Sequence, residues 1–294
     1  MSIDFSNKTA IISGAAGGIG LALAQELGQQ GMQIVMADID FKALQQSADQ
    51  LSQQGLSVLA CELDVTDYTQ WESVVKAAKD QFGGVHMVVN NAGVGGIPSS
   101  IEQTDSNIWQ WVVDVNMTGV MFGAKAAIPA IKETGEGGWV INVASMAGMH
   151  GVPYATAYSA TKAAVVSMTE SWAVELKSHN IHVAALCPAF VKTRIHESLR
   201  TKQEKYETSA LKGNAEQLKK GFNKAAALVE SGIDAELLAK RVVEALNNKQ
   251  MYIFTHPNYR ESVGYRGKAI DNAFKDAQNS PLVKHLTDDE IVSL

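Results

Sequence analysis

Tyr158 and Lys162 lie four residues apart in a helical pattern that begins near Tyr154, so their side chains project from one face of a helix, one turn apart. Ser145 precedes Tyr158 by thirteen residues and follows the apolar run 139–144, which is typical of a buried strand. A phenol has an ordinary pKa of about 10 and is a poor base at neutral pH. A nearby ammonium favours the phenolate, and lowering the phenol pKa by about 2–3 units requires roughly 3–4 kcal/mol of differential stabilisation. The three side chains therefore predict a proton-transfer site, if the fold brings them together.

A glycine-rich turn near the start of the chain is the second chemical feature. The apolar run 9–13 leads into Ser13-Gly-Ala-Ala-Gly-Gly-Ile-Gly20, and a helical pattern opens inside this turn. Glycines allow a tight turn, and the free N–H groups and positive dipole end of the helix can hold a pyrophosphate. The spacing is Gly-x-x-x-Gly-x-Gly rather than the Gly-x-Gly-x-x-Gly of the standard dinucleotide fingerprint, so by itself it leaves a purely structural turn open. The candidate cofactor contacts in this turn are Gly14, Gly18, Ile19 and Gly20.

Asp38 bears on which dinucleotide would bind. It ends the strand-like run 33–38, 18 residues after Gly20, where a carboxylate can accept hydrogen bonds from the adenine ribose hydroxyls. The same carboxylate would repel a 2′-phosphate, and neighbours such as Ala16 and Ile39 supply no compensating positive charge. The sequence therefore favours NAD over NADP. The alternative is a solvated acid at the end of a strand.

The elements that must position these residues alternate as strand and helix up to about residue 255. The strands are apolar on both faces, as expected of a parallel sheet covered by helices on both sides. Repeated strand–helix units imply right-handed crossovers. The predicted fold class is α/β, a single-domain Rossmann-type doubly wound parallel sheet of about seven strands with helices on both faces. The expected strands are 9–13, 33–38, 57–64, 86–90, 139–144, 181–186 and 251–254, and helices are expected over 18–30, 40–54, 104–133, 154–178 and 261–277, with two more capped by Thr66 or Asp67 and by Asp234.

Composition narrows the class of protein. The chain has 294 residues, of which 46% are hydrophobic and 19% charged, enough to build a sizeable core. A net charge of −6 argues against a nucleic-acid surface, and no apolar run approaches the roughly 18 residues of a membrane span. The start lacks a signal-peptide pattern. Two cysteines, Cys61 and Cys187, are interpreted as free thiols rather than one bridge, and no His or Cys spacing fits a metal site. We expect a cytoplasmic protein.

Taken in chain order, these residues resemble the short-chain dehydrogenase/reductase family, in its compact NAD-dependent branch with an extended C-terminus. The resemblance covers about residues 5–255. It rests on the glycine motif, Asp38, Asp64-Val65, Asn90-Asn-Ala-Gly93, Asn116, Ser145 and Tyr158-x-x-x-Lys162. Any one motif is weak evidence, whereas seven in the family's order are specific.

The resemblance implies a role for each catalytic residue. Tyr158 would be the acid/base, and Ser145 would hold the substrate oxygen against it. Lys162 would lower the phenol pKa and grip the nicotinamide ribose, while Asn116 would order a water that connects the lysine to solvent. The NAD cofactor would be bound by Gly14, Gly18, Ile19, Gly20, Asp38, Asp64, Val65, Asn91, Ala92, Gly93, Tyr158, Lys162, Pro188, Val191 and Thr193.

Three features depart from the family pattern. Ser13 stands where threonine is usual, and Ala189 stands where the family usually carries glycine, so that its β-carbon is expected to crowd the backbone near the nicotinamide. The chain also runs roughly 40 residues beyond the usual end. We therefore predict a dinucleotide-binding domain over 1–255, including a substrate loop or lid at 194–230, and an extension over 256–294 packed on the same domain.

The expected substrate pocket is mostly apolar. An apolar lining favours a bulky hydrophobic alcohol or ketone, aromatic or alicyclic, over a phosphorylated sugar or a small acid. The ending of the chain, including 252–257 and 260–273, also resembles bacterial dehydrogenases that act on the benzylic alcohol of lignin-derived aromatic dimers. The predicted lining residues are Gly95, Ile97, Ala147, Met149, Pro153 and Phe190.

Three functional hypotheses remain open from the sequence. The first is an NAD-dependent dehydrogenase that oxidises a secondary alcohol to a ketone. The second is a ketone reductase, against which Asp38 argues because cellular NAD pools favour oxidation. The third is a non-catalytic NAD-binding sensor or scaffold, against which the complete set of Asn116, Ser145, Tyr158 and Lys162 argues. The resemblance also implies a homodimer or homotetramer, since family members usually assemble through the long helices near 104–133 and 154–178.

Overall fold

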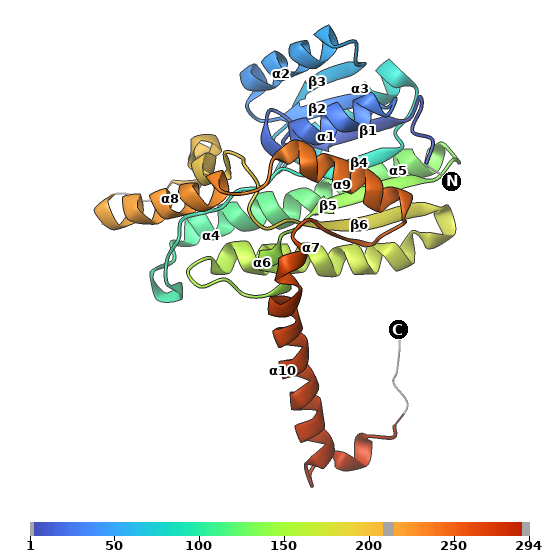
Figure 1. Ribbon diagram of the computed structural model, residues 1–294. Helices are drawn as coiled ribbons and strands as arrows, with labels where there is room; N and C mark the ends of the chain where they lie inside the picture. The colour runs from blue at the N-terminus through green and yellow to red at the C-terminus, as the bar shows by residue number, and fades with distance from the viewer. Residues whose placement is uncertain (1–2, 208–214, 290–294) are drawn as a thin grey trace. The chain divides into compact units, whose positions relative to one another are not determined.

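A computed structural model of the protein describes residues 3–207 and 215–289, and the chain divides into two compact units, Met1–Thr255 and His256–Leu294. The first unit is built on seven parallel strands in the order β3-β2-β1-β4-β5-β6-β7 (Figure 1). This confirms the predicted α/β class and the sheet of about seven strands. The strands are β1 (Thr9–Ser13), β2 (Gln33–Asp38), β3 (Val58–Glu62), β4 (Met87–Asn90), β5 (Gly138–Val143), β6 (Ile181–Cys187) and β7 (Tyr252–Phe254).

Helices cover both faces of this sheet. One hydrophobic cluster joins the strands to α1 (Gly18–Gln29), α2 (Phe41–Gln53) and α9 (Ala235–Asn247). A second cluster joins them to α3 (Tyr68–Phe82), α4 (Ser106–Val113), α5 (Gly119–Glu133) and α7 (Thr156–Glu175). Alternate residues of a strand point to opposite faces, and in β1 Ala10 and Ile12 enter the first cluster while Ile11 enters the second.

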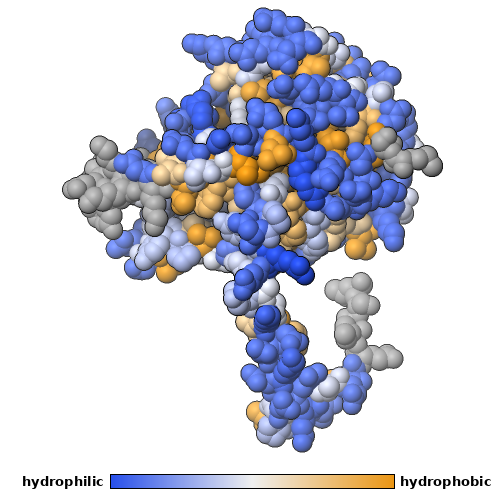
Figure 2. All heavy atoms as spheres, in the orientation of Figure 1, coloured by the Kyte–Doolittle hydropathy of each residue, from blue (hydrophilic) through white to orange (hydrophobic). Residues whose placement is uncertain are grey.

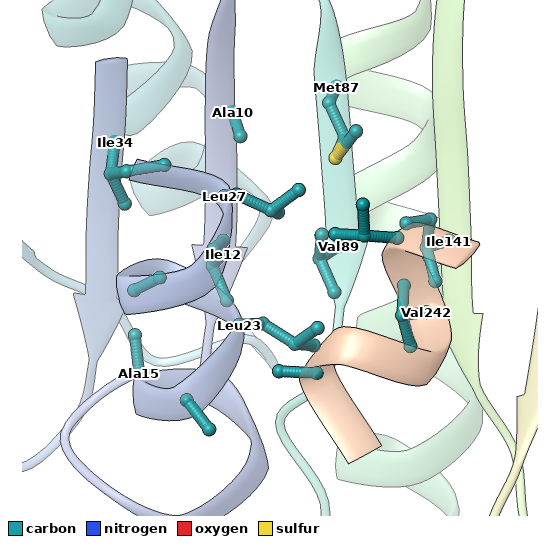
Figure 3. Close-up of a cluster of buried hydrophobic side chains, with 14 of the residues drawn as sticks. Ala10, Ile12, Ala15, Leu23, Leu27, Ile34, Met87, Val89, Ile141 and Val242 are labelled. Carbon is teal, nitrogen blue, oxygen red and sulfur yellow. The ribbon is translucent and has the colours of Figure 1, made fainter. Parts of the chain in front are cut away.

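The strand order places the site. Consecutive strands add outward from β1 to β2 and β3, after which the chain returns to β4 on the other side of β1. A reversal of this kind leaves a crevice outside the carboxyl ends of β1 and β4, where α/β proteins bind ligands. Figure 3 shows how the cluster below the crevice is built, with Leu23 and Leu27 of α1 and Val242 of α9 packed against Ile12 and Val89.

The predicted helix over 104–133 is not continuous. It is interrupted between α4 and α5 by a π-helical turn, η2 (Asp114–Thr118). The Asn116 side chain explains the interruption, because its amide donates to the Val94 carbonyl at 2.9 Å and accepts from the Val94 N–H at 2.8 Å. Single π-turns of this kind are frequent at functional sites.

Two helix caps were predicted from the sequence, and one of them forms in the structure. Asp67 caps α3 by accepting a hydrogen bond from the Thr69 N–H. Asp234 stands at the N-cap of α9 but makes no cap bond there. Its carboxylate instead accepts from the Lys192 ammonium at 2.7 Å. This ion pair links the segment after β6 to the start of α9.

Within the described residues, the polar segment after β6 forms two 3₁₀ helices followed by an α-helix. They are η4 (Ile195–Thr201), η5 (Glu204–Tyr206) and α8 (Ala215–Glu230). Residues 208–214 of the predicted lid lie outside the described residues. The remaining short elements of the first unit are η1 (Ile101–Gln103), α6 (Met146–Met149) and η3 (Lys177–His179).

The second unit consists of η6 (Pro257–Tyr259), α10 (Arg260–Asn279) and η7 (Lys284–Leu286). Helix α10 presents mostly hydrophilic residues (Figure 2). Over the parts of the chain that the structure describes, no helix is long and apolar enough to cross a membrane. Cys61 and Cys187 are both free.

The core below the crevice gives a stability prediction. Leu23 is fully buried, so Leu23→Ala is expected to lower the free energy of unfolding by about 3 kcal/mol through lost burial and a residual cavity. Leu237→Ala on α9 is the matched control, because Leu237 is 58% exposed and should change stability by no more than about 0.5 kcal/mol. Urea unfolding measures both. Equal effects of the two substitutions would contradict the packing described.

Candidate active site

The glycine turn after β1 leaves no room for side chains at two positions. A β-carbon on Gly20 would lie 2.3 Å from the Gly14 carbonyl oxygen, and one on Gly14 would lie 2.8 Å from the Ala92 Cα. Gly14 also has a φ of 66°, which favours glycine. The turn brings the backbone of residues 14–20 close to the end of β4 and opens directly into α1. The cradle and the helix N-terminus fit a pyrophosphate.

Ser13 and Asn91 hold that cradle in place. The Ser13 hydroxyl accepts hydrogen bonds from the N–H groups of Asn91 and Ala92 at 3.0 and 3.1 Å. The Asn91 amide donates to the carbonyls of Ser13 and Gly14 at 2.8 and 3.0 Å. A serine hydroxyl therefore suffices where the family usually has threonine, and the Asn91 side chain fixes the turn.

Asp38 lies at the end of β2 beside the glycine turn. Its carboxylate accepts from the Ala16 N–H and from the Asp40 N–H, both at 3.0 Å. Burial raises the pKa of Asp38, while these two backbone hydrogen bonds act in the opposite direction. The carboxylate is thus fixed in orientation at the edge of the crevice.

Lys162 is the most deeply buried charged group of the site. It is 3% exposed, and its ammonium donates a hydrogen bond to the Val143 carbonyl, at the end of β5, at 2.6 Å. The same nitrogen lies 5.7 Å from the centre of the Tyr158 ring. Burial lowers the pKa of Lys162 to about 8. Helix α7 therefore places the predicted ammonium beside the predicted phenol.

Ser145 completes the predicted group at the end of β5. As the N-cap of α6 it accepts from the Ala147 N–H at 3.1 Å, and its hydroxyl donates to the Pro188 carbonyl at 3.4 Å. Burial raises the pKa of Tyr158, and a hydrogen bond with the Ser145 side chain acts in the opposite direction. The hydroxyl, the phenol and the ammonium therefore meet at one place.

Asn116 and Gly93 connect this group to the cofactor side of the crevice. A β-carbon on Gly93 would lie 3.4 Å from both the Asn116 amide oxygen and the Lys162 nitrogen. The Asn116 amide also donates to the Thr161 hydroxyl, on the α7 turn before Lys162, at 3.4 Å. The four predicted catalytic residues are thus brought together. This arrangement can hold a hydroxyl substrate between Ser145 and Tyr158 and exchange its proton.

The ends of the remaining strands place the other predicted cofactor residues. Asp64 follows β3, and its carboxylate accepts from the Thr66 N–H at 2.9 Å. Val65 packs against Gly119, whose β-carbon would lie 2.9 Å from a Val65 methyl group. Beyond β6, the Thr193 methyl group would lie 3.0 Å from a β-carbon on Gly18, so this segment reaches the glycine turn. Ile19 lies next to this contact, in the first turn of α1.

The segment that begins with Pro188 includes Ala189, which stands where the family usually carries glycine. Among the described residues, the non-glycine residues with positive φ are Asn7, Tyr154, Asn180 and Lys249, so Ala189 is not in the left-handed region. Val191 forms a parallel bridge to Ile233, which fixes the path of the segment. Alanine at this position therefore causes none of the backbone strain that glycine is needed to relieve.

The predicted pocket residues lie on the loops after β4 and β6, on α6 and on the loop that follows α6. The Ser99 N–H donates to the Tyr154 carbonyl at 3.0 Å, which joins the loop of Gly95 and Ile97 to that of Pro153. Ala147 and Met149 belong to α6, directly after Ser145. Phe190 is 38% exposed, and its carbonyl accepts from the Ile233 N–H.

Several residues near the crevice had no sequence signal. Arg200, Gln203 and Tyr206 form side-chain hydrogen bonds with residues 92 to 160 positions earlier in the chain. Gly148 is also needed at the site and had no sequence signal. A β-carbon there would lie 2.5 Å from the Lys162 carbonyl oxygen and force α6 away from α7. A pattern of local spacing cannot reveal partners so distant in sequence.

Comparison with known proteins identifies the family. The family model described as short chain dehydrogenase matches residues 8–204. The chain is 30% identical over 270 residues to the CLA biosynthesis dehydrogenase/reductase of Lactiplantibacillus plantarum, covering 91% of this chain and 94% of that protein. It is 34% identical over 193 residues to the cyclohexanol dehydrogenase of Acinetobacter sp., covering 66% of this chain and 76% of the relative.

A solved structure agrees with this relationship. A short chain dehydrogenase/reductase from Burkholderia phymatum in complex with NAD superposes with a TM-score of 0.88 at 32% identity, covering 99% of this chain and 100% of the other. The chain therefore belongs to the short-chain dehydrogenase family and is an oxidoreductase of that family. The family resemblance predicted from the sequence motifs is confirmed.

The glycine turn gives a prediction with a built-in control. Gly20→Ala should weaken NADH binding by about tenfold or more, because its β-carbon overlaps the Gly14 carbonyl and must displace the turn. Gly17→Ala is the matched control, since a β-carbon there meets nothing within 4 Å and the φ of −176° suits any residue. Fluorescence titration with NADH measures both affinities. Wild-type affinity in Gly20→Ala would contradict the assigned cradle.

Proposed function

We propose that the protein is an NAD-dependent dehydrogenase that oxidises a secondary alcohol to a ketone, with Tyr158 as the base. The observation that carries this proposal is the meeting of Tyr158, Ser145 and the buried Lys162 ammonium at the carboxyl end of β5. A bound nicotinamide supplies the hydride acceptor. The protein supplies orientation and proton transfer.

The proton chemistry follows from the environment of the phenol. Ser145 holds the substrate hydroxyl, and the Tyr158 phenolate accepts its proton as the hydride leaves. In the free protein, burial raises the pKa of Tyr158. The ammonium of Lys162, together with the positive charge of an oxidised nicotinamide, opposes that effect by favouring the phenolate. Tyr158 is thus converted into a base when the oxidised cofactor is bound.

Asp38 supports NAD as the cofactor. Its carboxylate is fixed by the Ala16 and Asp40 N–H groups at the end of β2, where it can accept from ribose hydroxyls and would repel a 2′-phosphate. The similar Burkholderia phymatum protein was solved in complex with NAD. The glycine cradle beside Asp38 fits the pyrophosphate of either dinucleotide, so the carboxylate makes the distinction.

The proposed substrate is a bulky hydrophobic secondary alcohol, alicyclic or aromatic. The predicted pocket lining is mainly apolar and includes Ile97, Met149 and Phe190. The relative named cyclohexanol dehydrogenase supports an alicyclic alcohol. The second candidate function for this site is the reverse reaction, ketone reduction. The relative named dehydrogenase/reductase supports it.

A substrate panel combined with one substitution tests the proposal. Secondary alcohols, alicyclic and aromatic, are assayed for reduced nicotinamide with NAD and with NADP, and matching ketones are assayed in reverse. The wild type should turn over with NAD in preference to NADP. Tyr158→Phe should lower turnover by about 10²–10⁴-fold while NAD binding is retained, because only the proton-transfer group is lost.

Tyr265→Phe on α10 is the control and should behave as the wild type, since it removes an exposed phenol. Turnover retained in Tyr158→Phe would refute the mechanism. Tight NAD binding without turnover of any alcohol or ketone would instead support a non-catalytic NAD-binding protein.

The pH profile tests the role of Lys162. Tyr158 accepts a proton only as phenolate, so kcat/KM for alcohol oxidation is lost as the pH falls through the pKa of Tyr158. Lys162→Met removes the cation that lowers this pKa, and the acid limb should move to higher pH by about one unit or more. Rates are measured from about pH 6 to about pH 10, which brackets the ordinary phenol pKa and values lowered by several units. An unchanged acid limb would show that Lys162 does not tune the phenol.

A further inference from the structure

Residues 195–207, here called the strap, cross the carboxyl edge of the sheet. The strap begins after β6 and ends in contact with groups that follow β2 and β3. In the strand order β3-β2-β1-β4-β5-β6-β7, this path passes over the ends of β5, β4 and β1. With strands about 4.8 Å apart, four steps from β6 to β2 span roughly 19 Å. The strap therefore crosses the sheet edge at the switch point between β1 and β4.

The strap is anchored by buried side chains on both sides of its centre. Ser198 is 7% exposed, and its hydroxyl accepts from the Gly95 N–H at 3.1 Å. Tyr206 is 5% exposed, and its hydroxyl donates to the Asp114 carboxylate at 2.8 Å. The Lys202 ammonium donates to the Tyr206 carbonyl at 2.8 Å, which closes the last turn of the strap on itself.

Between and beside these anchors, the strap makes polar contacts at the Asp38 end of the crevice. The Arg200 guanidinium donates to the Asp40 carboxylate at 3.1 Å. The Gln203 amide donates to the Asp64 carboxylate at 2.9 Å. The Lys205 ammonium donates to the Thr66 hydroxyl at 2.9 Å. All three partners follow the carboxyl ends of β2 and β3.

Asp40 is connected directly to the predicted ribose ligand. Its N–H donates to the Asp38 carboxylate at 3.0 Å, and its own carboxylate accepts from the Ala43 N–H as the cap of α2. The other oxygen of the Asp40 carboxylate accepts the hydrogen bond from the Arg200 guanidinium. The ion pair thus joins the strap to the loop that orients Asp38.

We propose that the strap closes over the adenosine half of the bound dinucleotide and that the Arg200–Asp40 ion pair is the latch that sets its rate of release. This inference rests on the proposed function in one respect, that a nicotinamide dinucleotide occupies the crevice. Arg200 is then a positioning residue that acts through Asp40 and the strap. It slows release of the cofactor and has no part in the proton transfer.

The size of the effect follows from the exposure of the pair. Both side chains are about one third exposed, at 37% and 35%, so solvent weakens their attraction. Breaking such a pair should speed release by about three- to fivefold. Salt screens partly exposed charges, so the wild-type release rate should rise with ionic strength, and this dependence should shrink when either partner is neutral.

The test measures NADH release by stopped-flow fluorescence, with an excess of non-fluorescent NAD as the trap. The variants are Arg200→Ala, Asp40→Asn and the double substitution, each at low and high salt. Asparagine keeps the cap on α2, because it caps as well as aspartate. Arg194→Ala is the matched control, since Arg194 lies just before the strap and pairs with Glu197 in the same segment at 2.7 Å.

Faster release in both single variants, with no further increase in the double variant, supports the latch because the two residues then act as one unit. Arg194→Ala should release NADH as the wild type does. Unchanged release in Arg200→Ala, or slower release, would overturn the latch while leaving the proposed function intact. A wild type that binds neither NADH nor NADPH would refute the proposed function and the latch together.

Discussion

Lys162 carries an ammonium group into the interior of the protein, where the ammonium donates a hydrogen bond to the Val143 carbonyl at 2.6 Å. Burial of a cation is unfavourable, which is why the pKa of Lys162 falls to about 8. The folded protein therefore binds this proton less tightly than the unfolded chain. The charge costs stability below about pH 8, and that cost is relieved as the pH rises from about 8 toward 10.5. The proposed function gives the buried charge a use, since it stands next to a phenol that must ionise.

The surrounding architecture makes room for that charge and aims it. Gly148 lets α6 approach the α7 backbone at Lys162, and Gly93 leaves space beside its ammonium. The π-turn interrupts the helix at Asn116, whose amide pairs with both backbone groups of Val94. The end of β5 supplies the Val143 carbonyl and leads into Ser145. Each of these features serves the geometry around one lysine.

The sequence predicted the parallel sheet and the placement of Lys162 beside Tyr158 because both depend on local patterns. Apolar runs marked all seven strands, and a four-residue spacing put Tyr158 and Lys162 on one helix face. The break at Asn116 was missed because its cause, a hydrogen-bonded pair with Val94, lies 22 residues away. The strap contacts were missed for the same reason, since Arg200 and Asp40 are 160 residues apart. The backbone at Ala189 has no positive φ, and the expected crowding by its β-carbon near the nicotinamide stays a prediction.

The central claim is that the buried ammonium, with an oxidised nicotinamide bound, turns Tyr158 into a base. The most direct test is a pH titration of phenolate absorbance at saturating NAD, taken as the difference between the wild type and Tyr158→Phe. The difference isolates one phenol among the seven tyrosines of the chain. The account predicts a midpoint at least about one unit below the ordinary phenol value of about 10. A midpoint at or above that ordinary value would contradict it.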